Sequence, residues 1–187
     1  MLAWAPPTLL AVLQSLLYPD YNGWAFFTDG TVYTRYLVAI VAMVATERYA
    51  DDRLRLIVSQ FLQARMLSPD ARGKFDEIIG KANGLASHPW IEGLLFLLAL
   101  AWSWLSLYFV AAVSSSGWEE WSSGSEFRLS WAGITAELVS NPIFLFLLFR
   151  WFWRFLVWTV LLSRIARLPL RLTAIHPDRA GGLIFLA

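Results

Sequence analysis

Two arginines one helical turn apart interrupt the apolar stretch FLLFRWFWRFLVW. Arg150 and Arg154 are spaced i and i+4, which places both guanidinium groups on one face of a helix. An arginine at the centre of such a segment costs roughly 2.5–3.5 kcal/mol on membrane-insertion scales, so each must meet water, an anion or a carboxylate. Glu47 and Glu92 lie at the ends of neighbouring apolar runs and are the natural partners, whereas Glu137 lies at the opposite end.

The arginine pair has three interpretations. In a hydrated cavity, Arg150 and Arg154 would bind an anionic solute or headgroup. Paired with Glu47 or Glu92, they would fix the alignment of neighbouring helices. If the stretch lies partly in the membrane interface, the long basic side chains would reach water directly. We favour the structural and interfacial interpretations over anion binding.

A second group of polar residues forms a candidate functional turn near the end of the chain: His176, Pro177, Asp178 and Arg179. Zinc requires three or four ligands, and His176 and Asp178 supply two, so we predict no metal site and no cofactor. Proline fixes the backbone of such a turn, and the aspartate caps the next helix. The sequence also contains no GxSxG, HExxH, GxGxxG or P-loop motif, which argues against an enzyme.

Two resemblances start from this turn. The tripeptide 176–178, with basic residues upstream, is similar to the signature of J-domain proteins, in which it contacts a heat-shock chaperone; Pro169 departs from that family's helix. The Arg/Trp-rich run 148–158, the basic RIARLPLRL and the turn 176–183 together resemble an uncharacterised family of bacterial multi-span membrane proteins. That resemblance covers the chain from the second apolar run onward and implies no activity. It implies further spans after the turn, so that GGLIFLA would begin a fifth span and the chain would be a fragment.

The composition excludes a soluble domain. Hydrophobic residues make up 58% of the 187 residues and charged residues 16%, against roughly 45–50% and 25% in soluble domains. The net charge of +1 argues against a nucleic-acid partner. The absence of cysteine excludes disulfides and thiolate metal sites.

We therefore predict an all-α fold, a polytopic membrane bundle of about four transmembrane helices with a cytoplasmic helical hairpin. About 20 apolar residues cross a hydrocarbon core of about 30 Å. In one membrane domain covering residues 1–187, the expected spans are about 1–18, 31–49, 91–114 and 138–163.

The basic residues indicate the orientation. Residues 47–90 carry seven Lys or Arg and residues 163–187 carry four, whereas 19–30 carry none and 114–137 only Arg128. Because basic loops stay in the cytoplasm, both termini are expected inside, in what fits a bacterial inner membrane. We expect the tryptophans of the outer loop to lie in the headgroup layer.

The inner loop has helical structure of its own. Residues 37–67 contain no Gly or Pro, so the second span should continue beyond the membrane. Ser68, Pro69 and Asp70 form a helix start, and Asn83-Gly84 form a helix stop. Two amphipathic helices within about 50–84 would then bury their apolar stripes against each other. The two stripes are Leu54, Val58, Phe61, Leu62 and Met66, and Phe75, Ile78, Ile79 and Ala82.

Together these features predict an integral membrane protein without enzymatic activity that serves as a structural or assembly component. Its partners would be the lipid bilayer and other membrane subunits or further copies of itself. The alternatives are a transporter or channel-like protein that uses Arg150 and Arg154 for an anionic solute, and a membrane-tethered J-domain-like co-chaperone.

Overall fold

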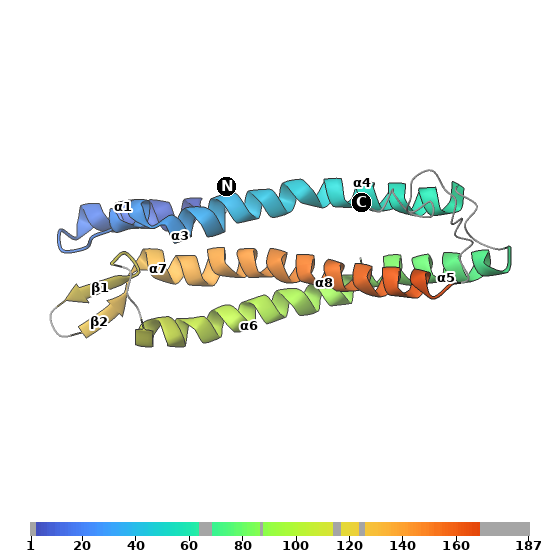
Figure 1. Ribbon diagram of the computed structural model, residues 1–187. Helices are drawn as coiled ribbons and strands as arrows, with labels where there is room; N and C mark the ends of the chain where they lie inside the picture. Colours follow the sequence, from blue (N-terminus) through green and yellow to red (C-terminus); the bar gives the residue numbers. More distant parts are fainter. Residues whose placement is uncertain (1–2, 64–68, 87, 114–116, 124–125, 169–187) are drawn as a thin grey trace. The chain divides into compact units, whose positions relative to one another are not determined.

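The computed structural model describes residues 3–63, 69–86, 88–113, 117–123 and 126–168 (Figure 1). These residues are mostly helical, as predicted, with one short two-stranded sheet that the sequence analysis missed. In chain order the elements are α1 (Ala5–Leu17), α2 (Ala25–Thr28), α3 (Gly30–Val32), the π-helical η1 (Tyr33–Ala39), α4 (Ile40–Gln63), α5 (Pro69–Ala86), α6 (Pro89–Val113), β1 (Glu120–Ser123), β2 (Glu126–Leu129), α7 (Trp131–Thr135), the π-helical η2 (Ala136–Ser140) and α8 (Asn141–Ala166).

The chain divides into two compact units. Unit 1 comprises Met1–Val44 and Trp90–Trp151, and unit 2 comprises Ala45–Pro89 and Phe152–Ala187. Helices α4, α6 and α8 contribute residues to both units. Each unit has its own cluster of buried side chains.

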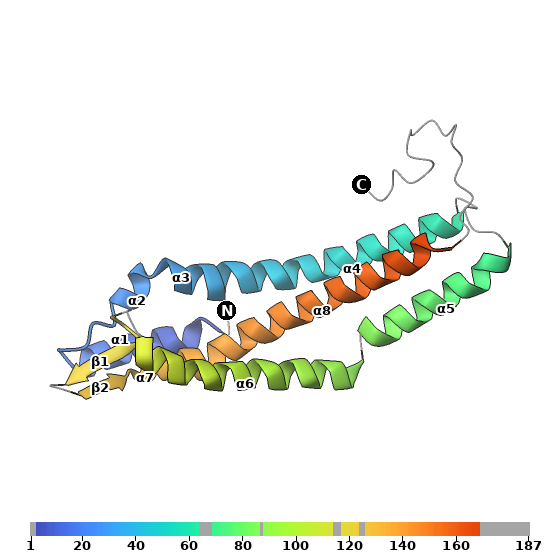
Figure 2. The same ribbon diagram turned by 60° about the horizontal axis from the view of Figure 1, so that its bottom comes forward.

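In unit 1, α1 lies beside α7 and η2 (Figures 1 and 2). Near the start of the chain, the Ala3 carbonyl accepts a hydrogen bond of 2.5 Å from the Ser140 hydroxyl. Near the end of α1, the Gln14 side-chain oxygen accepts one of 2.9 Å from the Trp131 backbone N–H. These two bonds fix α1 antiparallel to the segment from Trp131 to Ser140.

Helix α1 is shorter than the span expected over residues 1–18. It has 13 residues and a proline in its first turn, where the N–H has no helical partner in any case. At 1.5 Å per residue it is about 20 Å long, against a hydrocarbon core of about 30 Å. By length, the described helix is therefore shorter than such a core is thick.

The segment between α6 and α7 forms a hairpin rather than an irregular loop. Strands β1 and β2 pair antiparallel, with Glu120 opposite Leu129 and Ser123 opposite Glu126. Just before the hairpin, Trp118 is 2% exposed and packs edge-on against Phe26, with ring centroids 5.0 Å apart. The expectation that the tryptophans of this loop lie in the headgroup layer is wrong for Trp118, which belongs to the core of unit 1.

Unit 1 buries small and polar side chains beside its cluster of Phe26 and Trp118, and it exposes many large apolar side chains. Its described interior includes Ala99, Ser103, Ala132 and Ala136, while leucines, tryptophans and phenylalanines of α1 and α6 point outward. More than half of the surface of each of the following is exposed: Leu9, Leu16, Leu94, Leu97, Trp102 and Phe109. So many exposed large apolar side chains on two helices are unusual for a water-soluble domain.

In unit 2, three helices share one apolar cluster. Phe75 of α5 is fully buried together with Leu161 and Ile165 of α8. Ile57 and Val58 of α4 pack against the same cluster. We expected the stripes of the two loop helices to cover each other, but residues of α8 lie at the centre of the cluster.

The start of α5 is as predicted, and its end is not. The helix begins at Pro69, a residue type favoured in the first helical position. It continues through Asn83 and Gly84 to Ala86. The continuation has a tertiary cause, because the Trp153 indole N–H donates to the Leu85 carbonyl at 3.1 Å and satisfies one of the last helical acceptors.

Two helical stretches of the described chain are long and apolar enough to cross a membrane, judged by length and composition: Arg72–Leu107 and Trp131–Ala166. The span expected at 91–114 corresponds to α6. The span expected at 138–163 falls within a longer helical stretch that begins at Trp131.

The close approach of α7 to the chain before β1 provides a stability prediction. A Cβ added at Gly133 would lie 2.7 Å from the Glu119 carbonyl oxygen, whereas one added at Gly93 of α6 meets nothing within 4 Å. Gly133→Ala should therefore lower the thermal unfolding midpoint of the detergent-purified protein. Gly93→Ala should leave it unchanged or raise it, since alanine favours a helix over glycine by roughly 0.5–1 kcal/mol. Equal midpoints for the two variants would contradict this close contact.

Candidate functional site

Arg154 lies between two carboxylates of α4. Its Nη1 donates to Glu47 Oε1 at 2.9 Å, and its Nη2 contacts Asp51 Oδ1. Glu47 and Asp51 are one helical turn apart, so both carboxylates lie on the same face of α4. The side chains of Arg154 and Glu47 are 15% and 24% exposed, which places this cluster well within unit 2.

Arg150 is held by a weaker pair in unit 1. Its Nη2 lies 3.6 Å from Glu92 Oε1, beyond hydrogen-bond distance but within range of Coulomb attraction. Both side chains are more exposed than Arg154, at 34% and 42%. Glu92 lies in the first turn of α6, where the helix dipole favours a negative charge.

The structure thus pairs the predicted residues by opposite charge, Arg154 with Glu47 and Arg150 with Glu92. Arg154 faces one carboxylate, that of Asp51, in addition to the partner predicted from the sequence. The i,i+4 spacing of Glu47 and Asp51 is the signal that would have found it. In these contacts one guanidinium lies between two carboxylates of successive turns of α4.

A buried carboxylate was missed altogether. Glu137 of η2 is 7% exposed, and its Oε2 accepts hydrogen bonds from the Ser106 hydroxyl at 2.7 Å and the Asn141 amide at 2.8 Å. Both donors are neutral. Ser103, on α6 as Ser106 is, has a buried hydroxyl with no hydrogen-bond partner. Polar residues of α6 and η2 therefore lie in the interior of unit 1, whereas the sequence placed Glu137 only at the opposite end from the arginines.

Trp118 organises a further set of hydrogen bonds in unit 1. Its carbonyl accepts from the Tyr21 hydroxyl at 2.6 Å and the Ser130 hydroxyl at 2.7 Å. Its indole N–H donates to Asp29 Oδ2 at 2.9 Å. Burial raises the pKa of Tyr21. Burial also acts to raise the pKa of Asp29, but hydrogen bonds from Trp118 and Thr31 outweigh it and hold that pKa below its ordinary value.

The turn of His176, Pro177, Asp178 and Arg179 lies outside the described residues. Among the residues that are described, no three His, Asp or Glu side chains come together as they would at a metal centre. Comparison of the chain with protein-family models, with curated proteins and with solved structures finds no match. The two resemblances drawn from the turn therefore stay predictions.

The Arg154 cluster predicts unequal effects of neutralising the two arginines. Arg154→Gln should destabilise the protein by about 1.5–3 kcal/mol, the range for hydrogen bonds to charged groups. Arg150→Gln should have a smaller effect, near the 0–1 kcal/mol of exposed pairs. Chemical unfolding in detergent would measure both. Combining Arg154→Gln with Glu47→Gln should cost less than the sum of the single changes, and strict additivity would contradict the pairing.

The lowered pKa of Asp29 predicts acid sensitivity. A carboxylate whose pKa is lower in the folded state stabilises that state above its unfolded pKa, here close to 3.8, and the contribution is lost as the pH falls through the folded value. Asp29→Asn should therefore reduce the drop in unfolding temperature between pH 7 and pH 3. Asp20→Asn, in the same connecting segment but exposed, is the matched control. An identical drop in the parent protein and in Asp29→Asn would refute this role of Asp29.

Proposed function

We propose that the protein is an integral membrane protein with a structural or assembly role, in which the arginines hold helices together and do not bind a solute. The observation that carries the proposal is the neutralisation of both guanidinium groups by carboxylates. Arg154 faces Glu47 and Asp51, and Arg150 faces Glu92. A carrier for anions needs a guanidinium that is available to the solute, and each of these arginines already has an acidic neighbour.

The side-chain distribution of unit 1 supports the membrane location. Helices associate in lipid through small residues and interhelical hydrogen bonds, because large apolar side chains are as well accommodated by lipid as by protein. The buried alanines and serines of unit 1 and its outward leucines and tryptophans follow this rule. Buried polar residues such as Gln14 and Glu137 face the helix bundle, as polar groups in membranes do.

The pair of Arg150 with Glu92 supports a fourth span that begins and ends earlier in the chain than the predicted 138–163. Glu92 begins α6, and the apolar part of α6 follows it toward Val113. Arg150, 3.6 Å away, must therefore lie at the same membrane level as the start of α6. On this argument the fourth span is the 19-residue segment from Trp131 to Phe149 and not 138–163, and the arginines lie at the cytoplasmic boundary.

The orientation stays as the basic residues indicate. The seven Lys or Arg of residues 47–90 support a cytoplasmic location for that segment, and the four of residues 163–187 support the same location for the chain after α8. A bacterial inner membrane and a cytoplasmic location for the chain after α8 are part of this proposal. With three complete crossings, at η1–α4, α6 and α7–α8, the chain before η1 lies on the opposite side of the membrane, and α1 by itself is too short to add the fourth crossing that two cytoplasmic termini require.

Cysteine accessibility tests the topology directly, because the sequence contains no cysteine. In sealed vesicles of known orientation, Asp20→Cys should react with a membrane-impermeant maleimide from the outside only. Asp52→Cys should react from the cytoplasmic side only. Leu97→Cys, whose side chain is 63% exposed on α6, should react only after the membrane is dissolved, since lipid covers it. The topology would be overturned if Asp20→Cys and Asp52→Cys reacted from the same side of the membrane. Rapid reaction of Leu97→Cys in intact vesicles would also overturn it.

The same assay separates a structural role from anion transport. Leu147 lies one turn before Arg150 on α8 and is partly buried. Leu148, the next residue after Leu147, is exposed and serves as its matched control. A water-filled path to the arginines would make Leu147→Cys reactive in intact vesicles while Leu148→Cys stays protected. A structural role predicts protection of both. Reaction at position 147 alone would replace our proposal with the transporter.

A further inference from the structure

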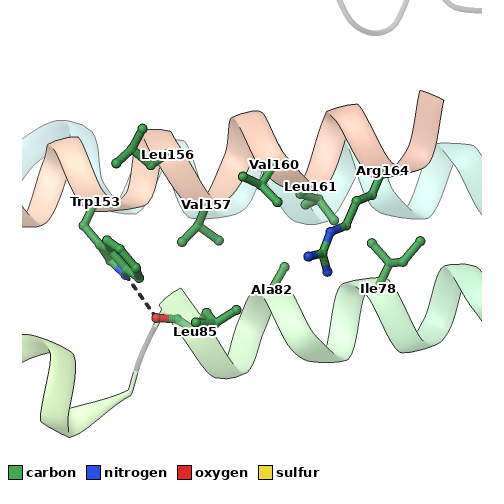
Figure 3. A pocket seen from close by; sticks show the side chains of 9 residues that line it. All are labelled: Ile78, Ala82, Leu85, Trp153, Leu156, Val157, Val160, Leu161 and Arg164. Atoms are coloured by element: carbon green, nitrogen blue, oxygen red, sulfur yellow. Dashed lines mark hydrogen bonds between the residues drawn. The ribbon is translucent and has the colours of Figure 1, made fainter. Parts of the chain in front are cut away.

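A groove between α5 and α8 lies entirely within unit 2 (Figure 3). Helix α5 contributes Ile78, Ala82 and Leu85. Helix α8 contributes six residues between Trp153 and Arg164, spaced by three and four so that they share one face. The groove is therefore a product of two regular helix faces and not of loop conformation.

The lining is apolar except at one end. The single charged residue is Arg164, and Figure 3 shows its side chain reaching from α8 toward α5, with the guanidinium between the two helices. Among the described residues, Arg164 forms no ion pair. At the other end the Trp153 indole N–H is already bonded to the Leu85 carbonyl, so the ring contributes only apolar surface to the groove. This lining is complementary to a ligand with one anionic end and an apolar body, and Arg164, in the last turn of α8, is exposed and accessible to it.

The dimensions favour a single extended chain. The groove has a volume of about 310 Å³, at the lower end of the range of ligand pockets. From Trp153 to Arg164 the rise along α8 is about 16 Å. This volume counts positions open to the centre of a water-sized molecule, so over this length it corresponds to a groove roughly 8 Å wide from wall to wall, whereas an α-helix with its side chains is about 10–12 Å across. A hydrocarbon chain, whose carbon atoms contact neighbours at about 3.5–4 Å, fits this width.

We propose that the groove binds one long-chain fatty acid, with the hydrocarbon tail between α5 and α8 and the carboxylate on Arg164. A guanidinium and a carboxylate form two parallel hydrogen bonds, which matches the single cation at the end of the groove. The tail covers Leu156 and Val160, which are otherwise 41% and 49% exposed. A diacyl phospholipid has a second chain for which the groove has no room.

The side chains beneath the groove support a site that exists before the ligand binds. Leu161 lines the groove and also belongs to the buried cluster with Phe75 and Ile165. Val157, also part of the lining, is 9% exposed. Because these residues are held by contacts within unit 2, the ligand meets an ordered surface. The inference concerns unit 2 alone and goes beyond the proposed structural role.

Photocrosslinking of the full chain in phosphatidylcholine nanodiscs tests the site. A palmitic acid analogue with a diazirine on its chain should label peptides of α5 and α8. Unlabelled palmitate should compete about tenfold better than methyl palmitate, which has the same chain without the charge. Phosphatidylglycerol, an anion with two chains, should compete no better than the methyl ester. Equal competition by phosphatidylglycerol and palmitate would overturn the assignment of a fatty acid.

Two variants with matched controls locate the binding. Arg164→Gln should abolish the preference for palmitate over its methyl ester, while Arg167→Gln, one turn away and outside the lining, keeps it. Val160→Trp should fill the groove and remove most of the labelling, while Leu162→Trp, exposed on α8 outside the lining, should not. If Leu162→Trp reduces labelling as much as Val160→Trp, or if Arg167→Gln acts like Arg164→Gln, the site is not this groove.

Discussion

The free-energy cost of an arginine among apolar helices governs the arrangement of α4 and α8 in unit 2. The Arg154 guanidinium is tolerated because Glu47 and Asp51 approach it from successive turns of α4. A slide of α4 by one residue would move both carboxylates by about 1.5 Å and turn them by about 100°, so neither contact would survive. The ion pair therefore contributes more to the choice of one helix register than to net stability, since much of its Coulomb energy offsets the cost of removing the charges from water.

A second constraint applies in unit 1, where small and polar groups are buried beside the cluster of Phe26 and Trp118. Ala99, Ala132 and Gly133 permit close approach of backbones, and hydrogen bonds such as Ser140 to Ala3 join segments that are distant in sequence. The part of the interior built from these groups has little hydrophobic driving force of its own. It depends on directional contacts, and this explains why Glu137 and Gln14 are buried there with hydrogen-bond partners.

The sequence predicted the features that local chemistry determines. A proline start at Pro69, the uninterrupted helix after the second apolar run and the limits of α6 all follow from residue types within one or two turns. The end of α5 did not follow, because a contact with Trp153 carries the helix past Gly84. The β1–β2 hairpin did carry a signal, because the two residues between its strands are Gly124-Ser125, but the Ser- and Gly-rich composition of the segment is also that of a loop.

In the candidate site, too, some features follow from local sequence and others depend on tertiary contacts. Glu47 and Glu92 could be named as partners because charges at the ends of apolar runs meet charges on the neighbouring helix. Predicting that Asp51 also contacts Arg154 required knowledge of how far α4 continues alongside α8. Predicting the burial of Trp118 and Glu137 required knowledge of which segments of unit 1 pack against one another. Pattern alone assigns such residues to an exposed loop.

Two helical stretches contain a π-helical segment close to their start, Tyr33–Ala39 after α3 and Ala136–Ser140 after α7. A π-helical turn holds one residue more than an α-helical turn, so the helix faces before and after it are out of phase by about 100°. Helical periodicity extrapolated backward from Arg150 therefore misassigns the side chains of α7. Loss of one residue between Ala136 and Ser140 would restore an unbroken α-helix and rotate Ser130 and Gly133 away from their contacts. In these two segments the number of residues, and not only their identity, determines which side chains face the interior.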